Sequence, residues 1–382
     1  MAGVFSERIA SVPVSGTVSI SDAVRQRRAR GDEVIDLSVG EPDAATPDAV
    51  VAACEKALRD GATTYGPSQG IRPLREAIAG DHERLRGQPI DPDQVLVTPA
   101  KHALLEAFLV LLDDGDEVLI PSPAWVSYAP QVRLCGAQPV QVPVGDEGQV
   151  PVDEMRERAN EDTQAVLVNS PSNPTGAVQT RETMAAVAEM AAEEDLTLVS
   201  DEVYGKLVYE GTFTSAAEVA PEDLEVVTVD GVSKAYAMTG WRIGWLTASP
   251  SFVQEALKVQ QHSVTHPTLF AQHGAVEALQ GDQGFVDRLR EGFADRRDLV
   301  VDRLEAMGAQ FPHPGGAFYV FARFPGVEDG GAFAHDLLDE AGVAVVPGEA
   351  FGPGGEGHVR LSYAVDRDTL ERGLDRIEEV LT

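Results

Sequence analysis

The stretch "EVVTVDGVSKAYAMTGWRIGW" (residues 225–245) joins a short apolar run to one of the few lysines of the chain. Lys234 is one of only five lysines, against 25 arginines. The run before it, "EVVTV", is short and rich in valine, which is typical of a strand buried in a parallel sheet. Because ligands bind beyond the carboxyl ends of such strands, we interpret Lys234 as a side chain with a chemical role.

Further apolar runs of this kind precede residue 225, and helical patterns alternate with them. They are "QVLVT" (94–98), "DEVLI" (116–120), "AVLVN" (165–169) and "LTLVS" (196–200). The alternation predicts an α/β fold: a large three-layer domain with a mainly parallel sheet covered by helices. One of its helices is predicted at 47–60, with Thr46 as its cap.

The pattern changes near residue 250. Two helical regions, 251–280 and 285–307, lead into "GAFYVFARF", "GVAVVPG", "HVRLSYAV" and a last helix at 367–381. This mixture predicts a smaller α+β domain. We therefore expect an N-terminal segment (1–45) that packs with the small domain, a large domain (46–277) and a small C-terminal domain (278–382).

The charge balance of the chain is strongly acidic. Sixty-two acidic residues against 30 basic ones give a net charge of −32, which disfavours nucleic acid and anionic membranes as partners. An ordinary solvated surface and adaptation to concentrated salt both explain the excess. We see no secretory signal and no apolar run near the roughly 20 residues of a membrane span. Cys54 and Cys135 fit neither a disulfide framework nor a metal site, so we expect a reduced, cytoplasmic protein.

Polar and aromatic side chains follow the predicted strands at the edge where ligands bind. After "QVLVT", Ala100 and Lys101 open an apolar helix whose first free amides can hold an anion. The other strands are followed by Trp125, Asn173, Asp201, Tyr204, Ser233, Lys234 and Arg242. The eight histidines are dispersed, so no metal site is expected, and no nucleotide-binding glycine motif precedes these residues.

Three motifs carry a resemblance to a known family. "SPSNPTG", "VSDEVYGKLVYEG" and "SKAYAMTGWRIGW", in this order and spacing, resemble the class I, fold-type I aminotransferases that use pyridoxal 5'-phosphate. "LSVGEPDAATP", "TTYGPSQGIRPLREAI", "SPAWVSY", "GVAVVPG" and "HVRLSYA" extend the likeness over nearly the whole chain, and the prokaryotic-type aspartate aminotransferases are the most similar branch.

The resemblance implies catalytic roles for Lys234, Asp201 and Tyr204. Lys234 forms the Schiff base with the coenzyme aldehyde and later moves the proton as general base and acid. Asp201 keeps the pyridine nitrogen protonated, which makes the ring an electron sink. Asn173 and Tyr204 bond the ring hydroxyl, and Trp125 stacks on the ring face.

The phosphate contacts are distributed along the chain. The resemblance assigns them to the amides of Ala100 and Lys101, to Ser233 and Arg242, and to Tyr65 from a second subunit, which implies a homodimer with shared active sites. An ordinary core position is the alternative for Tyr65. Gly231 stands where many relatives have a serine, and Ala100 where glycine is common, so these two positions depart from the family pattern.

Substrate contacts follow from the same resemblance. Arg360 binds the α-carboxylate in two-pronged fashion beside Asn173 and Trp125, and Gly40 lets the backbone approach. Ser15, Thr17 and Lys101 recognise a distal carboxylate, unless Lys101 serves only the phosphate or faces solvent. His102 has no assigned role.

The predicted reaction is exchange of amino groups between aspartate and 2-oxoglutarate in a ping-pong cycle, so the partners are a small amino acid and a 2-oxo acid. The alternatives are transamination of prephenate or of aromatic or neutral amino acids. A lyase that uses the same coenzyme and an amino-acid-sensing regulator without catalytic activity are weaker alternatives.

Overall fold

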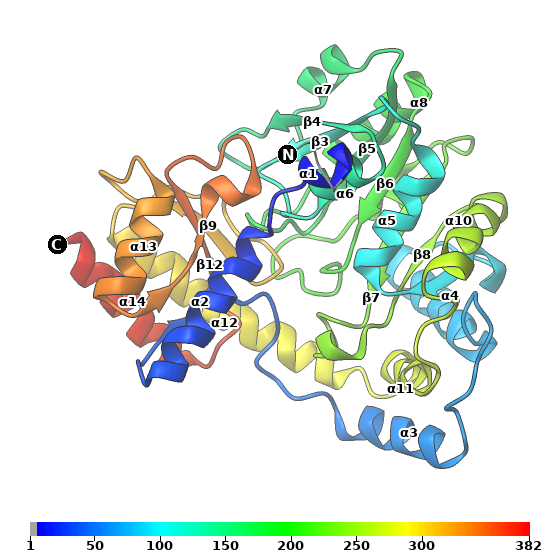
Figure 1. The fold of residues 1–382 in the computed structure, drawn as a ribbon, viewed down its shortest axis with the longest axis horizontal. Coiled ribbons are helices and arrows are strands. Elements are labelled where there is room, and N and C mark those ends of the chain that lie inside the picture. Colours follow the sequence, from blue (N-terminus) through cyan, green and yellow to red (C-terminus); the bar gives the residue numbers. More distant parts are fainter. Residues whose placement is uncertain (1–5) are drawn as a thin grey trace.

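A central sheet organises the computed structural model, which describes residues 6–382, and within these residues the sheet has seven strands (Figure 1). Their order is β2-β8-β7-β6-β5-β3-β4, and β8 runs antiparallel to its two neighbours while the other pairs are parallel. The bounds are β2 (Val95–Thr98), β3 (Glu117–Ser122), β4 (Gln138–Pro143), β5 (Thr163–Asn169), β6 (Thr197–Asp201), β7 (Val226–Gly231) and β8 (Gly244–Thr247). The predicted α/β class is confirmed.

Helices cover both faces of this sheet. Apolar residues at alternate positions of the strands pack on α5, α6 and α10 on one face and on α4, α8 and α11 on the other. The helices of this part are α3 (Asp48–Arg59), α4 (Arg72–Arg86), α5 (Ala100–Leu111), α6 (Tyr128–Leu134), α7 (Val152–Arg158), α8 (Arg181–Glu193), α9 (Ala216–Val219), α10 (Pro250–Ser263) and α11 (Leu269–Gln280), with the short 3₁₀ turns η1 (Pro92–Gln94) and η2 (Thr239–Trp241). The predicted strands and helices of this part lie within a few residues of the observed ones.

The C-terminal part has its own core and its own antiparallel sheet of order β11-β12-β9. Its elements are α12 (Gly284–Ala306), β9 (Tyr319–Arg323), α13 (Gly330–Glu340), β10 (Val343–Ala344), β11 (Val346–Pro347), η3 (Gly348–Phe351), β12 (His358–Ser362) and α14 (Arg367–Leu381). The long helix α12 leads from the large layered unit into this one (Figure 1).

The N-terminal segment is attached to the C-terminal part. It contains α1 (Glu7–Ala10), α2 (Gly16–Arg30) and β1 (Ile35–Asp36), and β1 pairs in parallel with β10. Val24 of α2 packs against Leu338 and Ala344. Helix α2 was not predicted, because Val24 is its single buried residue and the helix has no apolar stripe.

One detail of the prediction is wrong. Thr46 does not cap the helix that follows it, because α3 begins at Asp48 and Pro47 occupies the cap position. The Thr46 hydroxyl instead donates to the carbonyl of Ala237 at 2.6 Å and accepts from the Trp241 indole at 3.1 Å. Among the described residues, no helix is both long and apolar enough to cross a membrane.

Candidate active site

A cavity of about 450 Å³ lies beyond the carboxyl ends of β5, β6 and β7, within the volume range of small-molecule sites. Most of the predicted site residues line it: Thr17, Gly40, Ala100, Lys101, Trp125, Asn173, Asp201, Tyr204, Ser233, Lys234, Arg242 and Arg360. They come from the N-terminal segment, the large sheet and the C-terminal sheet. The fold therefore brings together residues that are far apart in the sequence.

Lys234 lies in the turn after β7 and points its amine into the cavity. Its Nζ donates to the carbonyl of Gly40 at 2.6 Å and lies 5.9 Å from the centre of the Tyr204 ring. Burial lowers the pKa of Lys234 to about 8, and the attraction of Glu41 opposes this shift. A substantial fraction of the amine is consequently neutral, and thus nucleophilic, at mildly alkaline pH.

Asp201 ends β6 and is almost fully buried, at 4% exposure. Its carboxylate accepts from the hydroxyl of Tyr128 at 2.7 Å and from the amide of Val203 at 3.3 Å. Burial nevertheless raises the pKa of Asp201 to about 6. A carboxylate held in this way strongly favours a cationic or proton-donating group beside it.

Arg360 in β12 is buried beside the ring of Tyr319, 4.4 Å from its centre. One terminal nitrogen donates to Asn173 Oδ1 at 3.0 Å and the other to the carbonyl of Ser38 at 2.6 Å. The Nε atom is buried without a hydrogen-bond partner. Because an unpaired buried donor is costly, this guanidinium has capacity for an anionic ligand.

Tyr204 also faces this group of residues. Its hydroxyl lies 2.9 Å from that of Tyr319, and burial raises the pKa of both phenols. Both therefore stay protonated at neutral pH and are available as hydrogen-bond donors.

The first turn of α5 forms another wall of the cavity. Ala100 and Lys101 contribute to it, and the first amides of a helix have no partner within the helix. Arg242 has left-handed backbone geometry (φ 59°), and its guanidinium donates to the carbonyl of Thr239 at 2.9 Å. These donors suit a phosphate group.

The glycine at 231 is explained by the packing of two strands. Gly231 pairs with Gly244 across β7 and β8, and a Cβ at position 231 would lie 3.0 Å from the Gly244 Cα. A Cβ at position 244 would lie only 2.7 Å from the amide nitrogen of Ala100. The two glycines thus allow the β7–β8 pair to approach the start of α5.

The side chains of Lys101 and His102 lie in different environments. The Lys101 amine lies 4.7 Å from the centre of the Trp125 ring, and burial and then the charge of Arg242 lower the pKa of Lys101. His102 does not line the cavity: its Nε2 lies 3.0 Å from the Ser263 hydroxyl and 3.1 Å from Glu106 Oε1. His102 thus lies beside the carboxyl group of Glu106, which is buried and whose pKa is raised by that burial.

Two predicted residues lie outside the cavity wall. Ser15 precedes α2, and its hydroxyl lies 3.1 Å from that of Thr17. Tyr65 is 87% exposed, with its ring edge against His266, so it does not occupy a core position. Within this chain neither side chain reaches the site.

Several cavity residues were missed from the sequence. Tyr128 belongs to the recognised motif "SPAWVSY", so its position carried a usable signal. Tyr319 lies on a C-terminal strand, and Val18 and Ser21 lie on α2; no local pattern marks them.

The residues present fit pyridoxal phosphate. The amine of Lys234 suits its aldehyde, the buried carboxylate of Asp201 suits its pyridine nitrogen, and the α5 amides with Arg242 suit its phosphate. Trp125 offers a ring face and Arg360 a free donor for a substrate carboxylate. Fold and site together define a pyridoxal-phosphate enzyme of fold type I.

Comparison with known proteins narrows this class. The chain belongs to the family described as "Aminotransferase class I and II", whose sequence profile matches residues 32–377. It is 42% identical to the aspartate/prephenate aminotransferase of Thermus thermophilus, covering 98% of both chains. It is 40% identical to aromatic-amino-acid aminotransferase 2 of Thermococcus litoralis, covering 91% of this chain and 92% of that protein.

Among solved structures, aspartate aminotransferase from Thermus thermophilus with maleate matches with a TM-score of 0.95 and 40% identity, covering 100% of both chains. The protein is therefore an aminotransferase that depends on pyridoxal phosphate, and it acts on small amino and oxo acids.

Proposed function

We propose that this enzyme transfers the amino group of aspartate to 2-oxoglutarate in a ping-pong cycle. The charge of the cavity carries the proposal. Four cationic side chains line it, Lys101, Lys234, Arg242 and Arg360, against the single carboxylate of Asp201, although the whole chain carries a net charge of −32. A phosphate and the two carboxylates of a dicarboxylic substrate together need this much positive charge.

Each cation has a distinct proposed role. Lys234 bonds the coenzyme and moves the proton between the substrate Cα and the coenzyme, and a pKa of about 8 suits this exchange. The coenzyme supplies the electron sink for the substrate carbanion. Arg242, with Ser233 and the amides of Ala100 and Lys101, holds the phosphate.

Four further residues contact the pyridine ring in this proposal. Asp201 holds the proton on the ring nitrogen, while Asn173 and Tyr204 donate to the ring hydroxyl. Trp125 stacks on the ring face and also contacts the substrate. The hydrogen bond from Tyr128 to Asp201 supports the assignment of Asp201, because it holds that carboxylate in one orientation.

The proposed substrate contacts involve two separate groups of residues. Arg360 binds the α-carboxylate with Asn173 beside it, and Gly40 lets the backbone approach the substrate. Lys101 and Thr17 bind the distal carboxylate. Ser15 acts through its contact with Thr17, since it does not line the cavity itself.

We further propose that the enzyme is a homodimer with shared sites. Tyr65 is 87% exposed in the single chain, which suits a residue that reaches the phosphate of a second subunit. We propose a cytoplasmic location, which is consistent with the two free cysteines. We attribute the net negative charge to adaptation to concentrated salt.

Prephenate is a second candidate acceptor. It is itself a dicarboxylate, so the same cations suit it, and the Thermus thermophilus relative is named for both substrates. Aromatic or neutral amino acids have no distal carboxylate, so they would leave Lys101 without a partner in the substrate. The presence of Lys101 therefore supports these substrates less well. A lyase on the same scaffold would release its product without passing on the amino group.

A spectroscopic half-reaction tests the proposal. We expect the visible coenzyme band to disappear on addition of aspartate and to return with 2-oxoglutarate. Turnover of aspartate, of prephenate with glutamate, and of tyrosine then ranks the substrates. Lys101→Met should lower kcat/KM for aspartate by about 10- to 100-fold, the worth of a charge-assisted hydrogen bond, and affect tyrosine much less.

The matched control is Lys258→Met, since Lys258 is exposed and pairs only with Glu255. Equal losses for aspartate and tyrosine in Lys101→Met would contradict the role of Lys101. A band that aspartate leaves unchanged would contradict the proposed reaction.

A further inference from the structure

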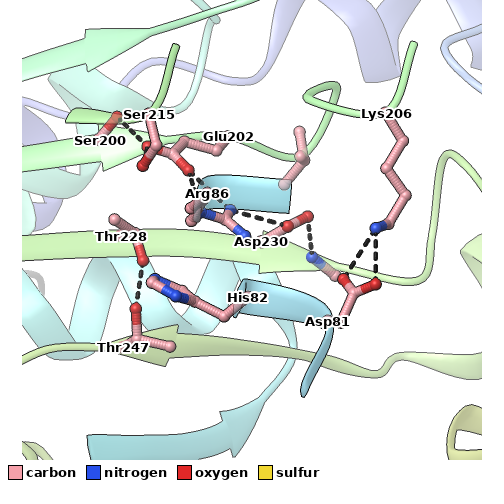
Figure 2. A network of polar contacts seen from close by, with 12 residues as sticks. Asp81, His82, Arg86, Ser200, Glu202, Lys206, Ser215, Thr228, Asp230 and Thr247 are labelled. Carbon is pink, nitrogen blue, oxygen red and sulfur yellow. Dashed lines mark hydrogen bonds and ion pairs between the residues drawn. The ribbon is translucent and has the colours of Figure 1, made fainter. Parts of the chain in front are cut away.

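A buried network of charged side chains joins α4 to β7 and to the residue that follows β6 (Figure 2). Its centre is Arg86, the last residue of α4, which is 2% exposed. The Arg86 Nε donates to Glu202 Oε2 at 2.7 Å, and Nη2 donates to Asp230 Oδ2 at 3.0 Å. One guanidinium thus connects the end of β6 with the end of β7.

The carboxylate of Glu202 is held on its other side as well. Its Oε1 accepts from the hydroxyls of Ser200 and Ser215 at 3.0 and 2.7 Å and from the amide of Ala216 at 3.1 Å. The carboxylate of Asp230 accepts from the amide of Gly231 at 2.6 Å. Both carboxylates therefore have fixed positions and fixed partners.

Helix α4 holds the segment after β6 at a second point. Lys206 donates to both carboxylate oxygens of Asp81 at 2.8 Å (Figure 2). Asp81 also pairs with Arg84. His82 of α4 is also buried, and its Nδ1 lies 3.0 Å from the carbonyl of Gln88, while the buried phenol of Tyr236 lies near the charges of Asp81 and Asp230.

The network lies directly behind the proposed coenzyme residues. Asp201 precedes Glu202, and Asp230 lies four residues before Lys234. Because successive side chains of a strand point to opposite faces, Asp201 faces the cavity while Glu202 faces α4. Tyr204 lies between Glu202 and Lys206, both of which are bonded to α4.

We propose that Arg86 is a positioning residue for the coenzyme site: it holds the ends of β6 and β7, and with them Asp201 and Lys234, from the reverse face of the sheet. The inference rests on the proposed role of Lys234. Helix α4 would thus affect catalysis by positioning Asp201 and Lys234, although Arg86 itself does not line the cavity.

Loss of the guanidinium has two physical consequences. Glu202 and Asp230 become unpaired buried carboxylates that repel each other, so the two strand ends move apart and coenzyme affinity falls. The potential in the cavity also becomes more negative, which favours the protonated form of the nitrogen that Lys234 contributes. The pH at which the visible coenzyme band changes should therefore rise.

The test compares Arg86→Met with Arg72→Met, a control on the same helix whose arginine is 63% exposed and pairs with Glu76. For Arg86→Met we expect the coenzyme dissociation constant to rise about tenfold or more and the band midpoint to rise by about one pH unit. The control should match the wild type. Thermal unfolding of the coenzyme-free variants measures stability separately.

Glu202→Gln provides a test with the opposite sign. It removes one negative charge and leaves Arg86 in place, so the band midpoint should fall. If Arg86→Met does not fold, the midpoint of Glu202→Gln by itself tests the proposed role of Arg86. A lower unfolding temperature with unchanged dissociation constant and midpoint would overturn the inference and leave Arg86 a purely structural role. A wild-type protein without the band would instead contradict the proposed function.

Discussion

The charged side chains on the two sides of β6 and β7 differ in how completely they are hydrogen-bonded. On the cavity side, Lys234 has one hydrogen bond to a carbonyl, and Arg360, which reaches the cavity from β12, retains an unpaired buried nitrogen. On the α4 face, Arg86 meets two carboxylates, and Glu202 accepts from several donors. On the α4 face, the charged side chains bond one another and need no ligand. On the cavity side, they keep hydrogen-bonding capacity that a bound ligand can use.

The largest effect is expected on the cavity face. Lys234→Ala removes the group proposed to bond the coenzyme and move the proton, so the rate of the aspartate half-reaction should fall by about 10⁴-fold or more. Stopped-flow absorbance measures this rate. Lys258→Ala, at an exposed site, is the control, and a half-reaction within about tenfold of wild type in Lys234→Ala would refute the assignment.

Arg360→Lys sharpens the comparison, since it keeps the charge but loses the planar fork. We expect kcat/KM for aspartate to fall by about 100-fold, because lysine cannot form a two-pronged pair while also bonding Asn173 and Ser38. Arg303→Lys is the control, an arginine that pairs with two surface carboxylates. Equal kcat/KM in Arg360→Lys and wild type would exclude this contact.

A third prediction concerns stability rather than rate. Burial raises the pKa of Asp201 from 3.8 to about 6 in the folded protein, so above pH 6 the coenzyme-free enzyme carries the cost of a buried charge, and this cost disappears as the pH falls toward 4. Asp201→Asn should stabilise the coenzyme-free protein by about 2 kcal/mol at pH 7 and by little near pH 4, while activity is lost.

Urea unfolding at several pH values measures this difference. Asp146→Asn, at an exposed position, should show no such pH-dependent gain. A destabilised Asp201→Asn at pH 7 would show that the hydrogen bonds from Tyr128 and Val203 outweigh the cost of burial.

The smallest effect concerns the outer surface, where repulsion within a net charge of −32 is exposed to salt. Raising KCl from about 0.1 to about 2 M should increase the unfolding temperature by several degrees, or about 1 kcal/mol, because salt screens exposed charges much more than the buried Arg86 network. Differential scanning calorimetry checks this. Undiminished stability in dilute buffer would contradict salt adaptation.

The sequence identified the cavity residues that lie in motifs just after strands, because topology brings the carboxyl ends of parallel strands together. It did not identify Tyr319, which reaches the cavity from a C-terminal strand with no local signal. Arg86 was also missed, since a basic residue at the end of a helix is typical of an exposed terminus. Only the packing of α4 on the sheet shows that this arginine is buried.

The paired glycines at 231 and 244 have a consequence for how the site can evolve. A Cβ at 244 would lie 2.7 Å from the amide nitrogen of Ala100, and a Cβ at 231 would lie 3.0 and 3.1 Å from backbone atoms of Gly244 and Ile243, so a side chain at 231 requires that backbone to shift by a few tenths of an ångström. Position 244 is thus closed to a side chain, and position 231 admits one only if β8 moves. A serine at 231 would place its side chain near Ala100 at the start of α5, so gaining a further phosphate contact there would require a backbone shift of β8 as well as the substitution.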